Sequence, residues 1–386
     1  MFNSLCFFAA MLAEIIFIVF LIGVLIQLGY LLSIFAHFFS LPANKPITTA
    51  AVPVSIIICA KNEADNLRRY LPKILAQRYK NDVGNSLFEV IVVNDASVDD
   101  TQEVLQALKE QYHLLNIVTI TDADNRDKPG KKYALSRGVA AAQHDVLLMT
   151  DADCEPLSES WLSYMVAPIV AEQKDIVLGY GKYRSVKGWL NAFIRWETLH
   201  TFVQYSSYAI LGMPYMGVGR NIACTKSVLL KAQQSPKWNK TASGDDDMLV
   251  QLAGEKDNVK VVYAKEAHTV STPKEHYADW KHQKQRHFST GKLYNNRSKL
   301  LLGLYGITHG LMWLLFIALL FTPYRNVAYI VMGARCIAYW VFWSYAANKL
   351  EEQAIIKNII PTDFGWALYN FVFSPYIIWK TKQTWK

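Results

Sequence analysis

Residues 145–153 read Asp-Val-Leu-Leu-Met-Thr-Asp-Ala-Asp, an apolar run that ends on two carboxylates. The consecutive apolar residues predict a buried strand over Asp145–Met149. Asp151 and Asp153 then lie on the turn that follows this strand. Ligands of open α/β sheets bind beyond the carboxyl ends of the strands. The stretch therefore predicts an α/β fold with an acidic site at one edge of its sheet.

The chain before this stretch alternates between strand-like and helix-like segments. Apolar, β-branched runs predict strands over Val54–Cys59, Phe88–Asn94 and Asn116–Ile120. Helical segments are expected over Ala64–Gln77, Asp99–Tyr112 and Gly130–Gln143. This alternation predicts a mostly parallel sheet with helices on both faces. Because the chain has no glycine-rich dinucleotide or P-loop motif, phosphates must be held in another way.

Strongly apolar segments flank this region. Ile15–Phe39 is almost purely apolar, and about 20 such residues cross a bilayer, so a transmembrane helix fits better than a cleavable signal peptide. Leu300–Thr322 and Asn326–Ala347 predict a transmembrane hairpin. Arg335, midway along its second helix, is expected to face other helices or a lipid phosphate. A last run, Phe364–Trp379, contains a proline, which leaves spanning, interfacial and re-entrant placements open.

These segments predict three parts of the chain. Residues 1–40 form an N-terminal transmembrane helix, residues 41–299 a catalytic domain, and residues 300–386 the hairpin with a further spanning or interfacial helix. None of the 40 Lys and Arg residues precedes Leu41, and most lie before Leu300. Positive residues near span ends favour the cytoplasmic side. We therefore expect an integral membrane protein with a cytoplasmic catalytic domain, in a bacterium at the inner membrane.

The net charge of +8 does not indicate a nucleic-acid-binding protein. The chain has no zinc-finger spacing, basic helix or aromatic-basic pattern typical of such proteins, and attraction to anionic lipid headgroups explains the charge more simply. The five cysteines show no CxxC spacing, which argues against a disulfide framework or a zinc site. A reducing compartment suits this pattern.

Two acidic clusters are candidates for chemistry. Asp151 and Asp153 suit Mg²⁺ or Mn²⁺, which bind few protein oxygens and complete their shell with phosphate; a solvated acidic turn is the alternative. Gly244-Asp245-Asp246-Asp247 precedes apolar residues of a predicted helix. These acids either favour the helix N-terminus through its dipole or supply a positioned base for an acceptor hydroxyl.

Two further segments combine charge with other chemistry. His282–His287 is basic. Its positive charge either stabilises a departing diphosphate or binds lipid headgroups next to the membrane. Lys187–Leu211 mixes aromatic and charged residues, which predicts a helix in the membrane interface that carries the acceptor, like the segment 275–297. An ordinary aromatic-rich core helix is the alternative. The residues concerned are Trp189, Phe193, Arg195, Trp196, Glu197, His200, Phe202 and Tyr205.

The order of motifs from about Val54 to Lys292 resembles the membrane-bound family-2 inverting glycosyltransferases. This group includes hyaluronan, chitin and cellulose synthases and ceramide glucosyltransferase. The matching motifs are Ser55–Glu63, Val93–Thr101, Gly130–Leu135, Asp151–Asp153, Gly217–Ala223, Gly244–Leu249 and Gln283–His287. The resemblance implies a nucleotide-sugar transferase domain of the GT-A type.

The resemblance also implies roles for individual residues. Asp246 would be the catalytic base and Arg286 the cation on the diphosphate. Asp153 would bind the metal with support from Asp151. The implied donor-binding residues are Glu63, Asp95, Lys131, Asp151, Asp153 and Gln283. The implied acceptor region comprises Trp189, Trp196, Gly219, Asn221, Asp245 and His287.

Two positions depart from the family pattern. Asn94 replaces the first acid of a common Asp-Asp pair, and His287 stands where the family has a tryptophan that stacks on the acceptor sugar. Loss of that tryptophan argues against processive polymerisation. We expect metal-dependent, inverting transfer of a sugar from a nucleotide sugar, a UDP-sugar by resemblance, to a membrane-associated lipid or glycan.

Two alternatives remain open. A processive polysaccharide synthase would couple polymerisation to export, although three or four spans are few for a channel unless oligomers or partners supply more. A catalytically silent membrane protein that binds nucleotide sugar is the other. Product length distinguishes a processive synthase from an enzyme that transfers a single sugar. Donor turnover would exclude the catalytically silent protein.

Overall fold

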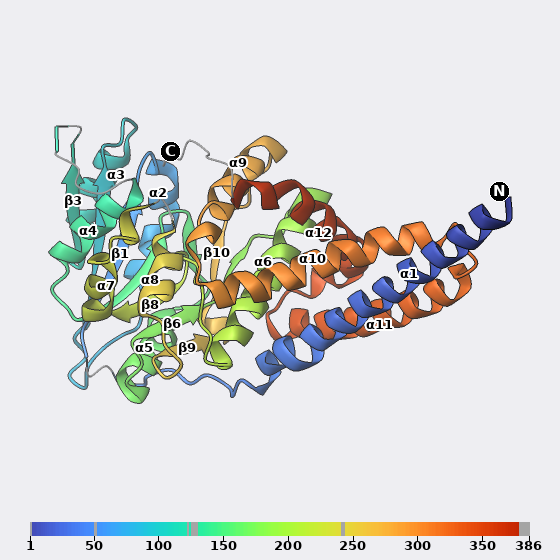
Figure 1. Ribbon diagram of the computed structural model, residues 1–386. Coiled ribbons are helices and arrows are strands. Elements are labelled where there is room, and N and C mark those ends of the chain that lie inside the picture. The colour runs from blue at the N-terminus through green and yellow to red at the C-terminus, as the bar shows by residue number, and fades with distance from the viewer. Residues whose placement is uncertain (1, 50–51, 122, 125–129, 241–243, 378–386) are drawn as a thin grey trace.

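The computed structural model describes residues 2–49, 52–121, 123–124, 130–240 and 244–377. The molecule is elongated, with a sheet domain at one end and long helices projecting from the other (Figure 1). A buried helix, α6, and the shorter helices α9 and α12 lie between these two parts. The fold thus joins an α/β sheet domain directly to apolar helices.

The central sheet has seven strands in the order β3-β2-β1-β4-β8-β6-β9. The strands β1, β2, β3 and β4 pair in parallel, as do β6 and β9, which confirms the predicted mostly parallel sheet. Strand β8 runs antiparallel to its neighbours β4 and β6, so the sheet is mixed beyond β4. The strands span Val54–Ala60 (β1), Phe88–Asp95 (β2), Leu115–Ile120 (β3), Val146–Asp151 (β4), Ile176–Gly179 (β6), Ile222–Thr225 (β8) and Val259–Val262 (β9).

Helices cover both faces of the sheet because successive side chains of a strand point to opposite sides. On β1, Ile57 and Cys59 join one hydrophobic cluster, whereas Ile56 and Ile58 join the other. The first cluster contains the helices α4, α6, α7 and α8, and the second α2, α3 and α5. These helices span Ala64–Leu75 (α2), Thr101–Gln111 (α3), Lys131–Ala141 (α4), Trp161–Glu172 (α5), Trp189–Ile210 (α6), Lys226–Gln233 (α7) and Asp245–Ala253 (α8).

A second, three-stranded sheet lies beside the acidic turn. It consists of β5 (Cys154–Pro156), β10 (Thr269–Ser271) and β7 (Gly181–Tyr183), with β10 in the middle. Strand β5 follows Asp153 directly, so the turn between β4 and β5 is held at both ends. The acidic pair therefore lies on a short connection between two sheets.

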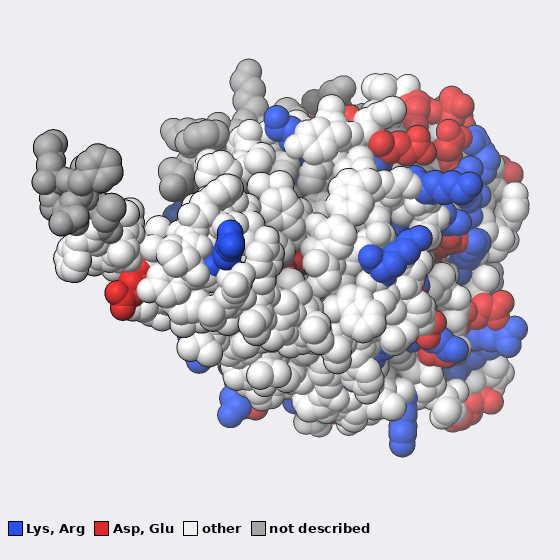
Figure 2. Space-filling view, turned by 90° about the vertical axis from the view of Figure 1, so that its right-hand side faces the viewer, with Lys and Arg blue, Asp and Glu red and all other residues white. Residues whose placement is uncertain are grey.

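Among the described residues, three helical segments are long and apolar enough to cross a membrane: Phe7–Ser40, Asn296–Leu319 and Arg325–Lys349. The first comprises most of α1 (Phe2–Gly29), a π-helical turn (Tyr30–Ile34) and a 3-10 helix (Phe35–Ser40). The others are α10 (Asn296–Leu319) and α11 (Arg325–Lys349). All three extend away from the sheet domain (Figure 1). Viewed from that end, the molecule shows a broad, mostly uncharged surface (Figure 2).

The last apolar run forms α12 (Ile359–Phe373) and a 3-10 turn (Ser374–Ile377). Its end at Trp379 lies outside the described residues. Helix α12 has 15 residues, which is shorter than the roughly 20 that cross a bilayer. Because the 3-10 turn continues the helical segment to Ile377, both a spanning and an interfacial position stay predictions.

A polar cluster joins α10, α11 and α12. The carboxylate of Asp363 on α12 forms an ion pair with Arg335 of α11. It also accepts a hydrogen bond from Trp313 Nε1 at 3.1 Å and lies 2.8 Å from His309 Nε2, both on α10. Arg335 thus faces other helices, as expected, and finds its counter-ion there rather than on a lipid. Charges at membrane depth are normally compensated in this manner.

Helix α6 is largely buried, as the core-helix alternative requires. Its charged side chains find partners within the protein: Arg195 pairs with Glu352, and Glu197 lies 2.6 Å from Lys284 of α9. His200 Nε2 lies 3.1 Å from the hydroxyl of Tyr305 on α10. The partners of these charged side chains lie far away in the sequence, and the interfacial position of α6 stays a prediction. The helix ties the sheet domain to α9, α10 and the segment after α11.

Candidate active site

One large cavity of about 1780 Å³ lies at the carboxyl ends of β1 and β4. Asp151 is the last residue of β4, and Asp153 follows one residue beyond on the turn to β5. Both line the cavity, as do Glu63 after β1 and Lys131 at the start of α4. The second acidic cluster and the basic helix α9 (Tyr277–Phe288) form other parts of the wall. The cavity therefore brings together motifs from five separate parts of the chain.

The acidic turn carries carboxylates in two different electrostatic environments. Asp151 Oδ1 lies 2.5 Å from Lys131 Nζ. Burial opposes ionisation of Asp151, but Lys131 outweighs it and leaves the pKa of Asp151 below its ordinary value. For Asp153, burial and the negative charge of Asp151 raise the pKa. A cation beside Asp153 would relieve this repulsion.

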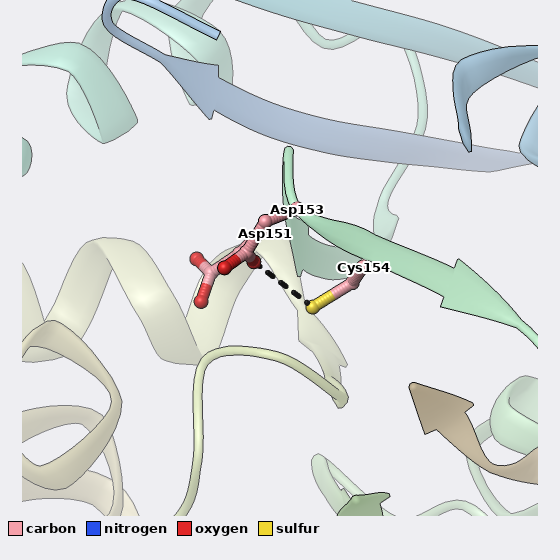
Figure 3. A group of neighbouring side chains, drawn as sticks. All are labelled: Asp151, Asp153 and Cys154. Atoms are coloured by element: carbon pink, nitrogen blue, oxygen red, sulfur yellow. Dashed lines mark hydrogen bonds between the residues drawn. The ribbon is translucent and has the colours of Figure 1, made fainter. Parts of the chain in front are cut away.

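Figure 3 shows the side chains of Asp151, Asp153 and Cys154 next to one another. One ligand atom from each lies within 4.8 Å of those of the other two. Burial raises the pKa of the Cys154 thiol well above its ordinary value, and Sγ lies 2.9 Å from Ser271 Oγ. Cys154 is therefore a protonated thiol and a poor metal ligand. The two carboxylates remain as oxygen donors, which fits Mg²⁺ or Mn²⁺ better than a thiolate-bound zinc ion.

The second acidic cluster opens α8. Gly244 precedes it with a φ of 76°, and a Cβ at this position would lie 2.4 Å from Thr290 Cγ2, so the turn requires glycine. Asp246 Oδ2 accepts a hydrogen bond of 2.6 Å from the backbone N–H of Gly219. Burial, with a smaller contribution from Asp245, raises the pKa of Asp246 to about 6.

The neighbouring Asp247 has a different environment. Its Oδ2 accepts hydrogen bonds from the hydroxyls of Thr290 at 2.7 Å and Tyr294 at 2.9 Å. These bonds join α8 to the segment that leads into α10. Asp245 lines the cavity. Of the three adjacent acids, Asp246 combines a position on the cavity wall with a pKa suited to a base near neutral pH.

Helix α9 supplies the basic wall. Gln283, Arg286 and His287 all line the cavity. Gln283 Nε2 lies 3.5 Å from the Tyr183 hydroxyl, and the adjacent Lys284 is fixed by its ion pair with Glu197. The Nε atom of Arg286 is buried and has no hydrogen-bond partner among the described residues. Arg286 can therefore donate to an anionic ligand in the cavity.

The structure adds Arg220, which the predicted site lacked. Its guanidinium stacks on the Tyr183 ring at 4.1 Å, and its side chain lines the cavity. The pKa of Arg220 is raised because burial is outweighed by nearby Tyr183, Cys154, Asp153 and Asp151. Its backbone carbonyl accepts hydrogen bonds from Thr150 and Thr269. Its motif, Gly217–Ala223, was identified from the sequence, but nothing there separated Arg220 from its neighbours.

Four predicted site residues lie elsewhere. Asn221 is fully buried and bonds to Trp161, Tyr180 and Ala267, and Trp196 packs between α6 and the C-terminal helices. Trp189 is half exposed at the start of α6 and does not line the cavity among the described residues. None of these three residues lines the cavity among the described residues, and their role in the acceptor region stays a prediction. Asp95 is fully buried at the end of β2 and is also absent from the described cavity wall.

The remaining predicted residues share the cavity wall. They are Glu63, Lys131, Asp151, Asp153, Gly219, Asp245, Asp246, Gln283, Arg286 and His287. Their roles stay predictions, but their common location brings acids, cations and a candidate base within one space. A mixed sheet with this site beyond its parallel strands defines a glycosyltransferase of the GT-A fold.

The chain belongs to the glycosyl transferase family group 2, whose family model matches residues 146–348. The related model described as glycosyl transferase family 2 matches residues 55–222. The two matches together cover the sheet domain and extend through α10 and α11. Sequence and structure therefore agree on the class of enzyme.

Individual relatives align over parts of the chain. A probable glycosyltransferase, YdaM of Bacillus subtilis, is 34% identical over 149 residues, which are 38% of this chain and 34% of that protein. Glycosyltransferase AglE of Haloferax volcanii is 28% identical over 184 residues, 47% of this chain and 54% of that protein. The alignments thus span about half of these relatives' lengths or less.

A solved structure with a similar fold is the mannosyltransferase PcManGT from Pyrobaculum calidifontis, in complex with GDP-Man and Mn²⁺. The superposition has a TM-score of 0.58 at 17% identity and covers 93% of this chain and 99% of that one. This likeness concerns the fold and includes the helices beyond the sheet domain.

Proposed function

We propose that this glycosyltransferase transfers one sugar, with inversion, from a nucleotide sugar to a lipid or glycan acceptor at the cytoplasmic face of a membrane. The observation that carries the proposal is Asp246, a cavity carboxylate with a pKa raised to about 6, facing the same space as Asp151 and Asp153. A carboxylate of this pKa is ionised at pH 7 and basic enough to accept a proton from a hydroxyl.

The reaction follows from the positions of these groups. Asp246 takes the proton of the acceptor hydroxyl while its oxygen attacks the anomeric carbon from the side opposite the diphosphate. The bond between sugar and phosphate breaks, and the nucleoside diphosphate leaves with the electron pair. Lys131, Arg220 and Arg286 stabilise the charge that accumulates on the leaving group.

Asp151 and Asp153 would hold a divalent cation, Mg²⁺ or Mn²⁺. When bound, it would neutralise charge on the diphosphate oxygens and favour departure of the nucleoside diphosphate. We assign a UDP-sugar as the donor on family resemblance. The GDP-Man bound by PcManGT makes a GDP-sugar the comparison to test against it.

Donor turnover tests the proposal. The full chain in detergent is incubated with UDP-sugars or GDP-mannose, with Mn²⁺, Mg²⁺ or a chelator, and an extract of membrane lipids and glycans. We expect metal-dependent release of nucleoside diphosphate and a product with inverted anomeric configuration. Asp246→Asn should abolish turnover, whereas the surface substitution Asp257→Asn should not. Equal release by Asp246→Asn and the unaltered protein would exclude Asp246 as the base.

A further inference from the structure

The cavity extends beyond the catalytic residues into the apolar helices. Its lining continues from Arg286 and Tyr294 along α10 as far as Ile317, and along α12 from Phe364 to Phe371. A volume of about 1780 Å³ exceeds the roughly 300–1,000 Å³ of a pocket for one small molecule. The cavity thus has room for a second ligand beside a nucleotide sugar.

The extension is a groove between α10 and α12, here called the α10/α12 groove. Its α10 wall beyond Tyr305 is apolar except for the indole N–H of Trp313, which is already donated to Asp363. Several wall residues are unusually exposed for their type, with Ile307 at 70% and Leu368 at 53%. The apolar lining residues are Leu302, Gly303, Gly306, Ile307, Gly310, Leu311, Trp313, Leu314, Ile317, Phe364, Ala367, Leu368 and Phe371, and Trp366, Tyr369 and Asn370 add polar atoms to the α12 wall.

Glycines on α10 keep the groove open. A Cβ added at Gly303, Gly306 or Gly310 would meet no atom within 4 Å. From Gly303 to Ile317 the groove follows α10 for about 21 Å at 1.5 Å per residue. Half of the hydrocarbon core of a bilayer is about 15 Å thick. The groove is therefore long enough to hold a hydrocarbon chain through one leaflet.

The small-residue spacing of Gly306 and Gly310 has another reading, since such pairs also pack transmembrane helices closely. Helix pairing does not explain why the space over these glycines opens into the cavity that contains Asp246. A glycan fits the groove poorly, because sugar hydroxyls need hydrogen-bond partners, which the α10 wall lacks and which the α12 wall offers only at Trp366, Tyr369 and Asn370 among the described residues. A long apolar chain satisfies both observations.

We infer that the acceptor is a lipid whose hydrocarbon chain lies in the α10/α12 groove, with its nucleophilic headgroup at Asp246. This inference rests on the proposed function and names the acceptor class for it. The headgroup enters between α9 and the start of α10, and the chain points along α10 away from the sheet domain. Chain binding thus fixes the hydroxyl or phosphate oxygen near the donor.

Photolabelling tests the inference. The full chain in detergent is labelled with a long-chain fatty alcohol that carries a diazirine near its methyl end, and the labelled peptides are identified by mass spectrometry. We expect labels on α10 between Gly303 and Ile317 and on α12 between Phe364 and Phe371. Gly306→Leu should reduce this labelling about tenfold or more by filling the groove.

Gly333→Leu is the matched control. Gly333 lies on the apolar helix α11, also has open space at its Cβ position and does not line the cavity. It should therefore retain labelling. Leucine favours a helix over glycine, so neither variant should lower the thermal midpoint. Gly310→Leu repeats the test about one helical turn further along α10.

Binding of UDP with Mn²⁺ separates failure of the inference from failure of the proposed function. Gly306→Leu should bind UDP as the unaltered protein does. Its rate of sugar transfer to lipid should fall about tenfold or more. Unchanged labelling and transfer in Gly306→Leu would overturn the lipid groove but leave the glycosyltransferase intact. No binding of any nucleotide sugar would overturn the proposed function itself.

Discussion

Asp246 and Asp363 differ in the groups that compensate the negative charge of their carboxylates. Asp363 in the apolar helices has an arginine, a histidine and a tryptophan around one carboxylate. Asp246 in the cavity accepts hydrogen bonds from two backbone N–H groups, those of Gly219 and Asp247, and forms no ion pair among the described residues.

The difference follows from what each carboxylate can do. A buried carboxylate bound to a guanidinium is held as an anion and has little tendency to take up a proton. Burial, with a smaller contribution from the neighbouring Asp245, raises the pKa of Asp246 to about 6, and its two backbone hydrogen bonds oppose this shift only in part. Incomplete compensation thus leaves Asp246 available for proton transfer, whereas Asp363 joins three helices.

The largest effect expected is on turnover. Asp246→Asn keeps the shape and the hydrogen bond from Gly219 but removes the base, so kcat should fall by about 10³-fold. The thermal midpoint should stay unchanged or rise, because the substitution removes a buried negative charge beside Asp245. Steady-state kinetics and a melting curve in detergent measure both, and a large loss of stability would show that Asp246 is structural instead.

The next effect concerns stability. Asp363→Leu leaves Arg335 buried without a counter-ion and should lower the free energy of unfolding by about 3–5 kcal/mol. Adding Arg335→Leu removes the uncompensated charge, so the double variant should recover part of this loss. Melting curves in one detergent test the order. A double variant less stable than Asp363→Leu alone would show that the unpaired charge of Arg335 does not cause the loss of stability.

Arg220 should have an intermediate effect on donor binding. Arg220→Met keeps an unbranched side chain beside Tyr183 but removes the cation, so KM for the nucleotide sugar should rise about tenfold or more. Arg220→Lys should restore only part of the affinity because it lacks the planar guanidinium that stacks on Tyr183. Unchanged donor kinetics in Arg220→Met would assign this arginine to the fold alone.

The smallest effect is a change with pH. The pKa of Asp246 is raised to about 6, and the reaction needs its ionised form, so kcat/KM should be level above this pH. Below it, kcat/KM should fall about tenfold per pH unit, as for any single essential base. In a pH series, a midpoint near the ordinary value for aspartate, 3.8, would show that burial does not tune this group.

The sheet and most of the site could be predicted from the sequence because their signals are local. Strand β1 was expected over Val54–Cys59 and spans Val54–Ala60, and the acids after it and after β4 lie where parallel strands end. Asp246 and Arg286 were placed by motifs of adjacent residues. Apolar runs of sufficient length likewise marked α1, α10 and α11.

Helix α6 could not be predicted in the same way. Its aromatic and charged composition fits either a membrane interface or a core, and the decision depends on partners far along the chain. Arg195 pairs with Glu352, 157 residues away, and Glu197 with Lys284, 87 residues away. No local pattern contains such pairings, so Trp189 and Trp196 were assigned to the acceptor region although Trp196 packs inside.

The buried position of α6 also sets what can be produced from this chain in isolation. Trp196 and His200 pack against Trp343 and Trp366, which belong to α11 and α12. A shortened protein that stops before α10 would present these rings, and the side chains of Arg195 and His200 without their partners, to water. Such a fragment should aggregate rather than yield a soluble enzyme. The sheet domain and its apolar helices must therefore be produced together in one chain.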